Sequence, residues 1–526
     1  MLYYHFLRVK PYRPGQIILD KILVKLPNPR HLEIQVPSIS IIFQKNLKKS
    51  FIHTSPKILN FSFNLTSPSI MNAKNEKKTS FGSDALASPV QPSNRSFSLS
   101  NRKPSIDPAR LGNMHALDPN NIVNELKSMT LKGNYNILFI GAGNINFGCD
   151  EGPWNHSVRL EHKLQTRLKV VGIIDPDLNR SQQVLKLKCA SFVERAYQNA
   201  HLCKSLDEFV EKIKPEEKPR AIIIGSPAQF HGSNLPGQDL ELQCLKHFPL
   251  AALFVEKPIS CAPCVNSYAL ADVLDQSKSV VSVGYMLRYL QVIQHMQRII
   301  AQTGKPVMMV VARYVCSYAK IRSQVWWNKS KSLGPIVEQG THLVDLCRYI
   351  GGEAILDSVQ AVSTEHYEEA GKLENIPIDE SKIPSEHRVP RTTSALWKFN
   401  SGAVCSFSHA LTLQGTKYST ELEVYLDGWQ LKVVDLYNDP VLYVRSPEAD
   451  SEQRVTFPAD DPYFGEISAW IDATEANISE TAIAEDDEDD LPNGILSDFR
   501  DACGTYALTW AIKEASERSL KTASKP

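Results

Sequence analysis

The interpretation of the whole chain starts from one segment, Tyr135-Asn-Ile-Leu-Phe-Ile-Gly-Ala-Gly-Asn-Ile-Asn-Phe147. Its apolar run, residues 137–140, ends at a glycine, which is typical of a buried parallel strand. Gly141 and Gly143 allow the backbone to turn tightly and to approach a pyrophosphate, which would bind at the N-terminus of the following helix. The segment therefore fits the first strand and turn of a dinucleotide-binding domain.

A second expected strand, residues 169–174, ends at Asp175. An acidic side chain at that place can accept hydrogen bonds from an adenosine ribose. The fingerprint is imperfect, because Asn146 replaces the third glycine and the gap to Asp175 exceeds the usual ~20 residues. We expect residues 149–156 to form an inserted loop. By itself the motif fits dinucleotide binding and an ordinary strand-to-helix turn equally well.

The composition of the 526-residue chain is that of a globular protein, with 42% hydrophobic and 22% charged residues. A formal net charge of zero gives no electrostatic case for a nucleic-acid partner. No run of about 18 apolar residues occurs, so we expect no membrane span. The 10 cysteines have no framework spacing, which favours a reducing compartment and a cytoplasmic location.

Residues 1–115 are expected to be a disordered or targeting-like extension. Residues 1–70 contain ten Lys or Arg but only two acidic residues. A basic segment that is poor in acids can be a mitochondrial transit segment, which keeps a mitochondrial location open. Several prolines interrupt any amphipathic helix in this region, and this favours plain disorder. Residues 72–112 are rich in Ser, Asn, Pro and Lys, as a disordered linker is.

From residue 134 onward apolar strands alternate with helical segments, which predicts a parallel, doubly wound sheet. Two further expected strands, residues 221–224 and 251–255, lead into Gly225-Ser-Pro227 and Glu256-Lys-Pro258. Ligands bind outside the carboxyl ends of the strands in such sheets. These strand ends therefore join the glycine turn as candidate ligand contacts.

After about residue 300 the pattern changes to consecutive hairpins, which predict an antiparallel or mixed sheet in a second, α+β domain. We assign residues 116–290 to a nucleotide-binding domain and residues 291–526 to this second domain. The expected strands of the second domain lie at residues 307–315, 396–411 and 422–434. We also expect a short helix, a surface loop, a solvated acidic loop and a final amphipathic helix at residues 118–129, 367–390, 485–490 and 499–518.

The clearest cluster of titratable residues consists of Glu338, His342 and Asp345. Their spacing of i, i+4 and i+7 places all three on one stripe of a helix. An imidazole flanked by two carboxylates can have a raised pKa and a fixed tautomer, which suits general acid–base chemistry. The spacing also fits a capped surface helix with ordinary i,i+4 pairs. We expect no metal site.

Lys257 is the second candidate for proton transfer. It follows a buried strand and precedes a proline, so it can donate or accept a proton beside a cofactor. The alternative is a surface lysine paired with Glu256. His231 lies four residues after Pro227, beyond the preceding strand, and either lines the cofactor or caps a helix.

Two further pairs leave both a functional and a structural interpretation open. Cys261 and Cys264 have redox spacing at the expected start of a helix, where a thiol pKa would be lowered, but coincidence is the simpler explanation. Trp326 and Trp327 fit stacking on a sugar and buried packing equally well.

The motifs occur in the order Gly141-Ala-Gly143, Gly225-Ser-Pro with His231, Glu256-Lys-Pro, Gly284-Tyr285 with Arg288, and the block 334–345. Together they resemble the Gfo/Idh/MocA oxidoreductases, the family of glucose-fructose oxidoreductase and inositol dehydrogenase. The resemblance covers the chain from about residue 134 to its end. It implies a Rossmann domain followed by an α/β domain with an open, largely antiparallel sheet. It also implies NAD(P)-dependent hydride transfer at a carbinol or carbonyl carbon of a sugar, polyol or similar small alcohol.

The resemblance assigns roles to individual residues. Lys257 matches the family's proton-relaying lysine, and His342 matches its active-site histidine. Glu338 stands where many relatives have Asp, and either Glu338 or Asp345 would orient the imidazole. The implied cofactor contacts are Gly141, Gly143, Asn144, Ile145, Asp175, Ser226, Pro227, His231 and Glu256.

Three further expectations concern the ligands and partners. Asp175 favours NAD because a carboxylate repels a 2′-phosphate, whereas Arg180 keeps NADP open. Relatives often pair through the second sheet, so the resemblance implies a homo-oligomer. A competing possibility is a non-catalytic dinucleotide-binding regulator, like the yeast galactose-repressor relative in this family. The long N-terminus motivates that possibility, and the presence of both Lys257 and His342 argues against it.

Overall fold

The computed structural model describes residues 9–11, 17–19, 133–149, 152–480 and 494–523. The chain divides into two compact units, residues 1–104 and 105–526. In the first unit, β1 (Val9–Pro11) and β2 (Ile17–Leu19) pair antiparallel. Apart from these two strands, the extension expected over residues 1–115 lies outside the described residues. The helix at 118–129 and the acidic loop at 485–490 lie outside them as well.

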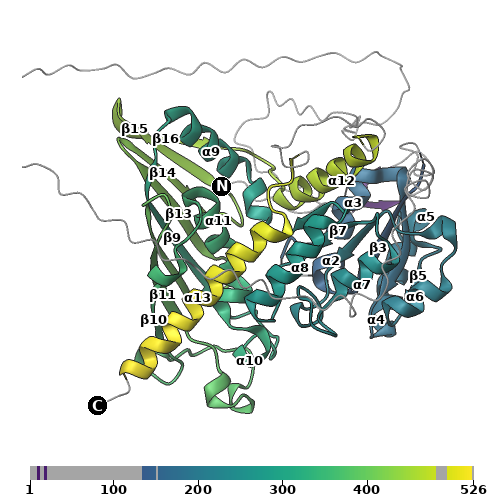
Figure 1. Cartoon of the computed structure of the whole chain (residues 1–526), viewed down its shortest axis with the longest axis horizontal. Coiled ribbons are helices and arrows are strands. Elements are labelled where there is room, and N and C mark those ends of the chain that lie inside the picture. The colour runs from purple at the N-terminus through teal and green to yellow at the C-terminus, as the bar shows by residue number, and fades with distance from the viewer. Residues whose placement is uncertain (1–8, 12–16, 20–132, 150–151, 481–493, 524–526) are drawn as a thin grey trace, which may run out of the picture. The chain divides into compact units, whose positions relative to one another are not determined.

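A six-stranded, all-parallel sheet with helices on both faces forms the first part of the second unit (Figure 1). The strand order is β5-β4-β3-β6-β7-β8, so the chain runs outward from β3 in both directions. The crevice at the carboxyl ends of β3 and β6 is therefore the topological switch point, where such sheets bind ligands. The strands are β3 (Tyr135–Ile140), β4 (Leu168–Ile174), β5 (His201–Cys203), β6 (Ala221–Ile224), β7 (Ala252–Val255) and β8 (Val281–Val283).

The helix after the glycine turn differs from the expectation. It is a single turn, α2 (Asn144–Phe147), and the inserted loop then leads into α3 (His156–Leu164). A phosphate at this turn would therefore meet the backbone N–H groups of the turn and not the dipole of a long helix. The other helices of this part are α4 (Leu178–Cys189), α5 (Glu194–Tyr197), α6 (Leu206–Lys212), α7 (Leu240–His247) and α8 (Cys264–Gln276).

Alternate residues of β3 face two separate apolar layers, as a strand buried on both sides requires. Phe139 belongs to a layer that includes Trp470 of α12 (Pro462–Glu480). Leu138 belongs to the opposite layer, which includes Tyr506 of α13 (Phe499–Ala523). Helices α12 and α13 thus return to cover the first sheet, one on each face.

The second sheet has eight strands in the order β10-β11-β12-β9-β13-β14-β15-β16. All neighbours pair antiparallel except β12 and β9, so the open, largely antiparallel sheet is confirmed. Gly428, with φ of 81°, forms the turn between β13 and β14. The strands are β9 (Val307–Ser317), β10 (Gln360–Thr364), β11 (Thr392–Lys398), β12 (Val404–Leu413), β13 (Ser419–Leu426), β14 (Trp429–Val434), β15 (Val441–Ser446) and β16 (Ala449–Thr456).

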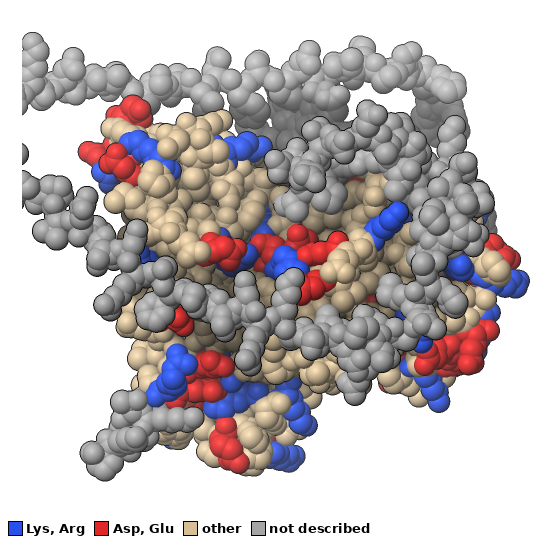
Figure 2. Space-filling model, in the orientation of Figure 1, with Lys and Arg blue, Asp and Glu red and all other residues tan. Residues whose placement is uncertain are grey.

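Charged side chains of both signs are interspersed on the face shown in Figure 2. Within the described ranges, no helix has the length and apolar character needed to cross a membrane.

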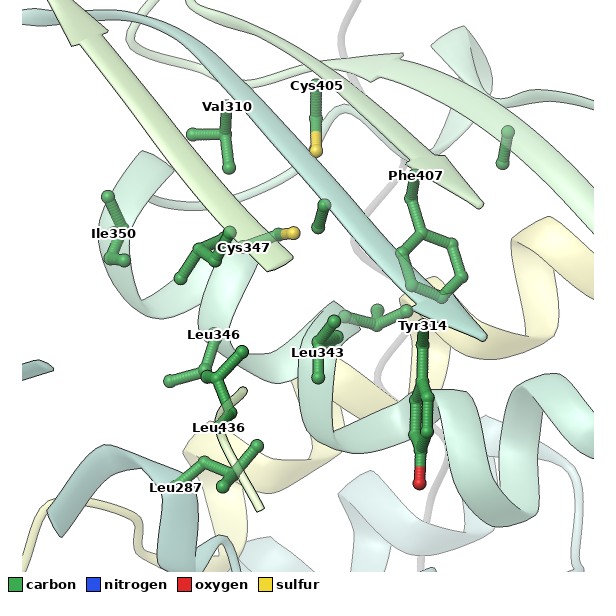
Figure 3. Close-up of a cluster of buried hydrophobic side chains, with 14 of the residues drawn as sticks. Leu287, Val310, Tyr314, Leu343, Leu346, Cys347, Ile350, Cys405, Phe407 and Leu436 are labelled. Atoms are coloured by element: carbon green, nitrogen blue, oxygen red, sulfur yellow. The ribbon is translucent and has the colours of Figure 1, made fainter. Parts of the chain in front are cut away.

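One face of the second sheet packs against α11 (Thr341–Gly351) through the apolar cluster in Figure 3. Leu343 and Cys347 of α11 lie against Val310 of β9 and Phe407 of β12. The hydroxyl of Tyr314 points away from this cluster (Figure 3). This packing fixes the rotation of α11 and therefore the direction of His342. The remaining helices of this part are α9 (Gln291–Thr303) and α10 (Lys329–Ser332).

We predict that Trp470→Ala lowers the free energy of unfolding by about 3–5 kcal/mol, the usual cost of deleting a buried indole. Trp470 is fully buried, and its ring lies 5.5 Å from the Phe254 ring of β7, measured between centroids. Urea unfolding followed by near-ultraviolet circular dichroism measures the change. Leu187→Ala is the control, because Leu187 is 73% exposed. Equal effects of the two substitutions would contradict the described packing of α12.

Candidate active site

A cleft of about 590 Å³ lies between the carboxyl ends of the parallel strands and the second sheet. The glycine turn after β3 lines one wall, through Gly141 and Gly143. Lys257, from the loop after β7, lines the middle. Glu338 and His342 line the opposite side, so the cleft gathers most of the residues that the sequence singled out.

The glycine turn is tightly packed at its first residue and open at its third. Gly141 has a φ of 98°, and a Cβ there would lie 2.8 Å from the carbonyl oxygen of Gly225. A Cβ on Gly143 would meet no atom within 4 Å, so this backbone faces open space in the cleft, beside Asn144 and Ile145. This geometry is what a backbone cradle for a phosphate requires.

Asn146, which replaces the third glycine, stabilises the turn from behind. Its side chain is fully buried, and its amide nitrogen donates a hydrogen bond of 2.7 Å to the carbonyl of Gly141. A Cβ on Gly225 would lie 2.6 Å from this amide. Asn146 therefore fills the space between two strand ends, and Gly225 is glycine because Asn146 lies there.

Asp175 lies at the end of β4 and lines the cleft together with Arg180. One carboxylate oxygen accepts a 2.8 Å hydrogen bond from the N–H of Ala142, and the other accepts a 2.9 Å bond from the N–H of Asp177. Asp175 thus links the first two strand ends. Each carboxylate oxygen has a further lone pair for a ligand hydroxyl.

Ser226 and Pro227, after β6, line the cleft as expected. The buried Ser226 hydroxyl has no hydrogen-bond partner among the described residues, which suits a ligand contact. His231 does not line the cleft. It is 1% exposed, and its Nδ1 lies 3.3 Å from the carboxylate of Glu241 on α7, so its contacts are internal.

Glu256 lines the cleft but is 6% exposed. One carboxylate oxygen lies 2.6 Å from Nε2 of His156, and the other accepts the backbone N–H of Lys257 at 3.1 Å. His156 was not predicted as a site residue, and it is fully buried at the start of α3. It follows the inserted loop, and its neighbour Asn155 caps the helix.

Lys257 crosses the cleft. Its Nζ donates a 3.1 Å hydrogen bond to the backbone carbonyl of Glu338 and lies 3.6 Å from the Glu338 carboxylate. The Lys257–Pro258 peptide bond is cis. Glu338 lies in a π-helical turn, η5 (Ile336–Gly340), which precedes α11. Such turns are frequent at functional sites.

His342 is neutral near pH 7, contrary to the expectation of a raised pKa. Burial, together with the nearby charge of Lys257, lowers its pKa well below the usual value. Its Nδ1 has no hydrogen-bond partner in the described part of the chain. Burial raises the pKa of Glu338 despite the opposing effect of Lys257.

Asp345 does not orient His342 in this structure. Its carboxylate accepts hydrogen bonds of 2.7 Å and 2.6 Å from Arg288 and one of 2.7 Å from the Thr505 hydroxyl. Arg288 also pairs with Asp501 of α13. The third member of the i, i+4, i+7 stripe thus joins α11 to α13 through Thr505 and Arg288.

Several cleft residues were not predicted from the sequence. The sheet side contributes aromatic groups from β9 and from the loops next to the sheet, and η5 contributes an amide group. Gln339 accepts a 2.9 Å hydrogen bond from Nε2 of the buried His409, and its amide donates to the Cys316 sulfur. The further cleft residues from this side are Tyr314, Ser317, Gly415, Thr416, Tyr418 and Tyr437.

The cysteine and tryptophan pairs have separate outcomes. Cys261 and Cys264 are free thiols, and burial raises the pKa of each to about 11, which fits the simpler interpretation, a coincidence of spacing. Trp326 lines the cleft, whereas Trp327 is fully buried.

In the described part of the chain, no three His, Cys, Asp or Glu side chains converge to hold a metal ion.

Both parts of the second unit match models of protein families. Residues 135–285 match an oxidoreductase family with an NAD-binding Rossmann fold. Residues 288–429 match an oxidoreductase C-terminal domain. The two matches meet between β8 and α9, where the chain passes from one sheet to the other.

Two uncharacterized proteins of Schizosaccharomyces pombe are similar to this chain. One is 46% identical over 72% of this chain and 91% of its own length. The other is 42% identical over 72% of this chain and 96% of its own length.

Solved structures share the fold at low sequence identity. The UDP-N-acetylglucosamine 3-dehydrogenase GnnA of Acidithiobacillus ferrooxidans is 15% identical, with a TM-score of 0.51 over 73% of this chain and 98% of that one. The 3-ketoreductase KijD10 of Actinomadura kijaniata, in complex with NADP and TDP-benzene, is 14% identical, with a TM-score of 0.52 over the same shares. An oxidoreductase of Agrobacterium radiobacter, in complex with NAD+, L-tartaric acid and magnesium, is 12% identical, with a TM-score of 0.52 over 73% and 97%.

We predict that His409→Gln reduces the loss of stability in acid. Burial lowers the pKa of His409 from 6.5 to about 3. The unfolded chain therefore binds the extra proton first, and the free energy of unfolding falls as the pH drops from about 6.5 toward 3. For a fully buried group the slope approaches ~1.4 kcal/mol per pH unit. Glutamine keeps a donor for Gln339 and removes the titration.

Urea unfolding between pH 7 and pH 4 tests this. The exposed His162 supplies the control, His162→Gln. A stability-versus-pH slope that is the same in His409→Gln and in the unsubstituted protein would contradict the burial of a neutral imidazole beside Gln339.

Proposed function

Because the chain belongs to the Gfo/Idh/MocA family of oxidoreductases, we propose that it transfers a hydride between NAD(P) and a carbinol or carbonyl carbon of a sugar, polyol or similar small alcohol. One observation carries this proposal. The amino group of Lys257, the carboxylate of Glu338 and the neutral imidazole of His342 share one cleft with the glycine turn of the Rossmann domain. Proton-handling groups beside a nucleotide cradle suit a dehydrogenase.

The residues of the cleft fit a dinucleotide. The open backbone at Gly143 and the unpartnered hydroxyl of Ser226 suit the phosphates and a ribose, and Asp175 suits the adenosine ribose. When bound, the nicotinamide would accept or donate the hydride. Lys257 and Pro258, at the carboxyl end of β7, would flank the reacting carbon from the Rossmann side.

Lys257 and His342 would handle the proton. In the oxidation direction, the neutral imidazole accepts the hydroxyl proton of the alcohol, and the Lys257 amino group donates a hydrogen bond to the same oxygen. In the reduction direction, the proton returns along the same path. Glu338 would act as a positioning residue, because its backbone carbonyl fixes Lys257.

The aromatic lining of the cleft suits a ring-shaped or polyhydroxylated substrate. Trp326, Tyr418 and Tyr437 present apolar ring surfaces with polar edges, which favour the alternating CH and OH groups of a sugar. Gln339 adds an amide group to the same wall.

Two copies of the chain would pair through the outward face of the second sheet. Exposed apolar side chains lie there on neighbouring strands: Val362 of β10, Leu396 of β11 and Val404 of β12 are 62%, 53% and 46% exposed. An exposed sheet face of this kind suits a self-complementary contact.

We predict that Lys257→Ala lowers turnover about a hundredfold to a thousandfold, because the hydrogen-bond donor to the reacting oxygen is removed. NADH affinity should change little, because the phosphate contacts remain. A panel of sugars and polyols, followed by the absorbance of NADH, provides the rate. Lys372→Ala is the control, since Lys372 is exposed outside the cleft.

Unchanged turnover in Lys257→Ala would contradict the role assigned to Lys257. If the unsubstituted protein binds NADH but turns over no member of the panel, the non-catalytic regulator becomes the better description.

We predict that the full chain binds NADH more tightly than NADPH, because the carboxylate of Asp175 repels a 2′-phosphate. Titration of nicotinamide fluorescence measures both affinities. Asp175→Asn should reduce the discrimination about tenfold, the effect of one charged contact. Asp177→Asn is the matched control, because Asp177 caps α4. A preference for NADPH would instead assign the phosphate contact to Arg180.

A further inference from the structure

Three cations from one segment of the second domain line the cleft: Lys320, Arg322 and Lys331. The segment connects the end of β9 at Ser317 with the π-helical turn that carries Glu338. All three side chains are exposed within this wall. They belong neither to the glycine turn nor to the group that handles the proton.

The acids of the cleft are already engaged by other partners. Glu256 is held by His156 and a backbone N–H, Glu338 lies against Lys257, and Asp175 accepts two backbone N–H groups. In the described part of the chain, none of the three cations forms an ion pair. The cleft therefore has an uncompensated positive wall, which favours an anionic ligand.

The segment is anchored, so the cations have defined positions. Trp327 is fully buried, and its indole N–H donates a 2.7 Å hydrogen bond to the carbonyl of Ile321, between the first two cations. The N–H of Tyr318 donates to the carbonyl of Leu413 at 3.0 Å. These bonds hold the backbone at Tyr318 and at Ile321, beside Lys320 and Arg322, so the backbone needs little ordering there when a ligand binds.

The segment lies on the substrate side of the cleft. It leaves the carboxyl end of β9, and its parallel neighbour β12 ends beside it and leads to Gly415 and Thr416, which also line the cleft. Trp326 of the same segment adds a ring surface. The cofactor's phosphates, in contrast, have their own cradle at the glycine turn.

We propose that Lys320, Arg322 and Lys331 form an anion subsite, and that the substrate is a sugar or polyol bearing a phosphate or carboxylate group. The inference rests on the proposed function for the reacting end of the substrate. The guanidinium of Arg322 provides paired donors for two oxygens of either anion, and the lysines supply point charges. The subsite would hold the anionic end and direct the carbinol carbon toward Lys257.

The test uses the full chain saturated with NADH, so that the cofactor's own phosphate contacts are filled. Isothermal titration then measures the binding of inorganic phosphate, of acetate and of neutral glycerol. We expect an anion to bind and glycerol not to bind. A preference for phosphate indicates a phosphate ester, and a preference for acetate indicates a sugar or polyol acid.

The double variant Lys320→Gln/Arg322→Gln should lose about tenfold or more in anion affinity, as expected when charged hydrogen bonds are removed. Lys331→Gln should lose a smaller factor. Arg322→Lys should keep part of the affinity, because the charge remains without the paired donors. Lys372→Gln, outside the cleft, should bind the anion as the unsubstituted protein does.

Three results would overturn the subsite: no anion binding by the unsubstituted protein, equal binding by the double variant, or an equal loss of NADH affinity in the double variant. The last result would mean that the three cations bind the cofactor and not the substrate. Failure of the proposed function would appear separately, as an absence of NADH and NADPH binding to the unsubstituted protein before any anion is added.

Discussion

The hydrogen bond from Lys257 to the backbone carbonyl of Glu338, 3.1 Å long, connects the two halves of the cleft. Lys257 follows a strand of the parallel sheet, and Glu338 precedes the helix that packs on the antiparallel sheet. Each side is rigid for its own reason. Burial on both faces fixes β7, and the apolar cluster around α11 fixes the turn before it. The contact therefore sets the distance between the nucleotide cradle and His342, and the proposed chemistry depends on that distance.

Much of the fold could be predicted because its signals are local. The strand from Tyr135, the glycine turn and the Asp427-Gly428 hairpin each follow from a few neighbouring residues. The return of α12 and α13 to the first sheet could not be predicted in this way. Trp470 and Tyr506 have apolar patterns that fit any helix, and only the tertiary structure determines which sheet they cover. The inserted loop before α3 could be predicted, but the burial of His156 beside Glu256 could not, because it depends on contacts between distant segments.

At the candidate site, too, the local sequence could not predict contacts between side chains from distant segments. The spacing of Glu338, His342 and Asp345 was interpreted as one helical stripe, but a π-helical turn separates the first residue from the other two. Asp345 pairs with Arg288, and His342 has Lys257 as its charged neighbour. The imidazole pKa therefore falls where two flanking carboxylates would have raised it. Spacing predicts which face a side chain occupies, whereas its protonation depends on partners from distant segments.

A crystal structure of the full chain with NAD+ tests the central claim most directly. The account predicts that the pyrophosphate lies against the backbone of Gly141 to Ile145 and that Asp175 contacts the adenosine ribose. It also predicts that the nicotinamide lies between Lys257 and His342, with its reactive face toward the second sheet. A nicotinamide bound away from Lys257, or a dinucleotide bound outside this cleft, would contradict the assignment of the cleft as the active site of a dehydrogenase.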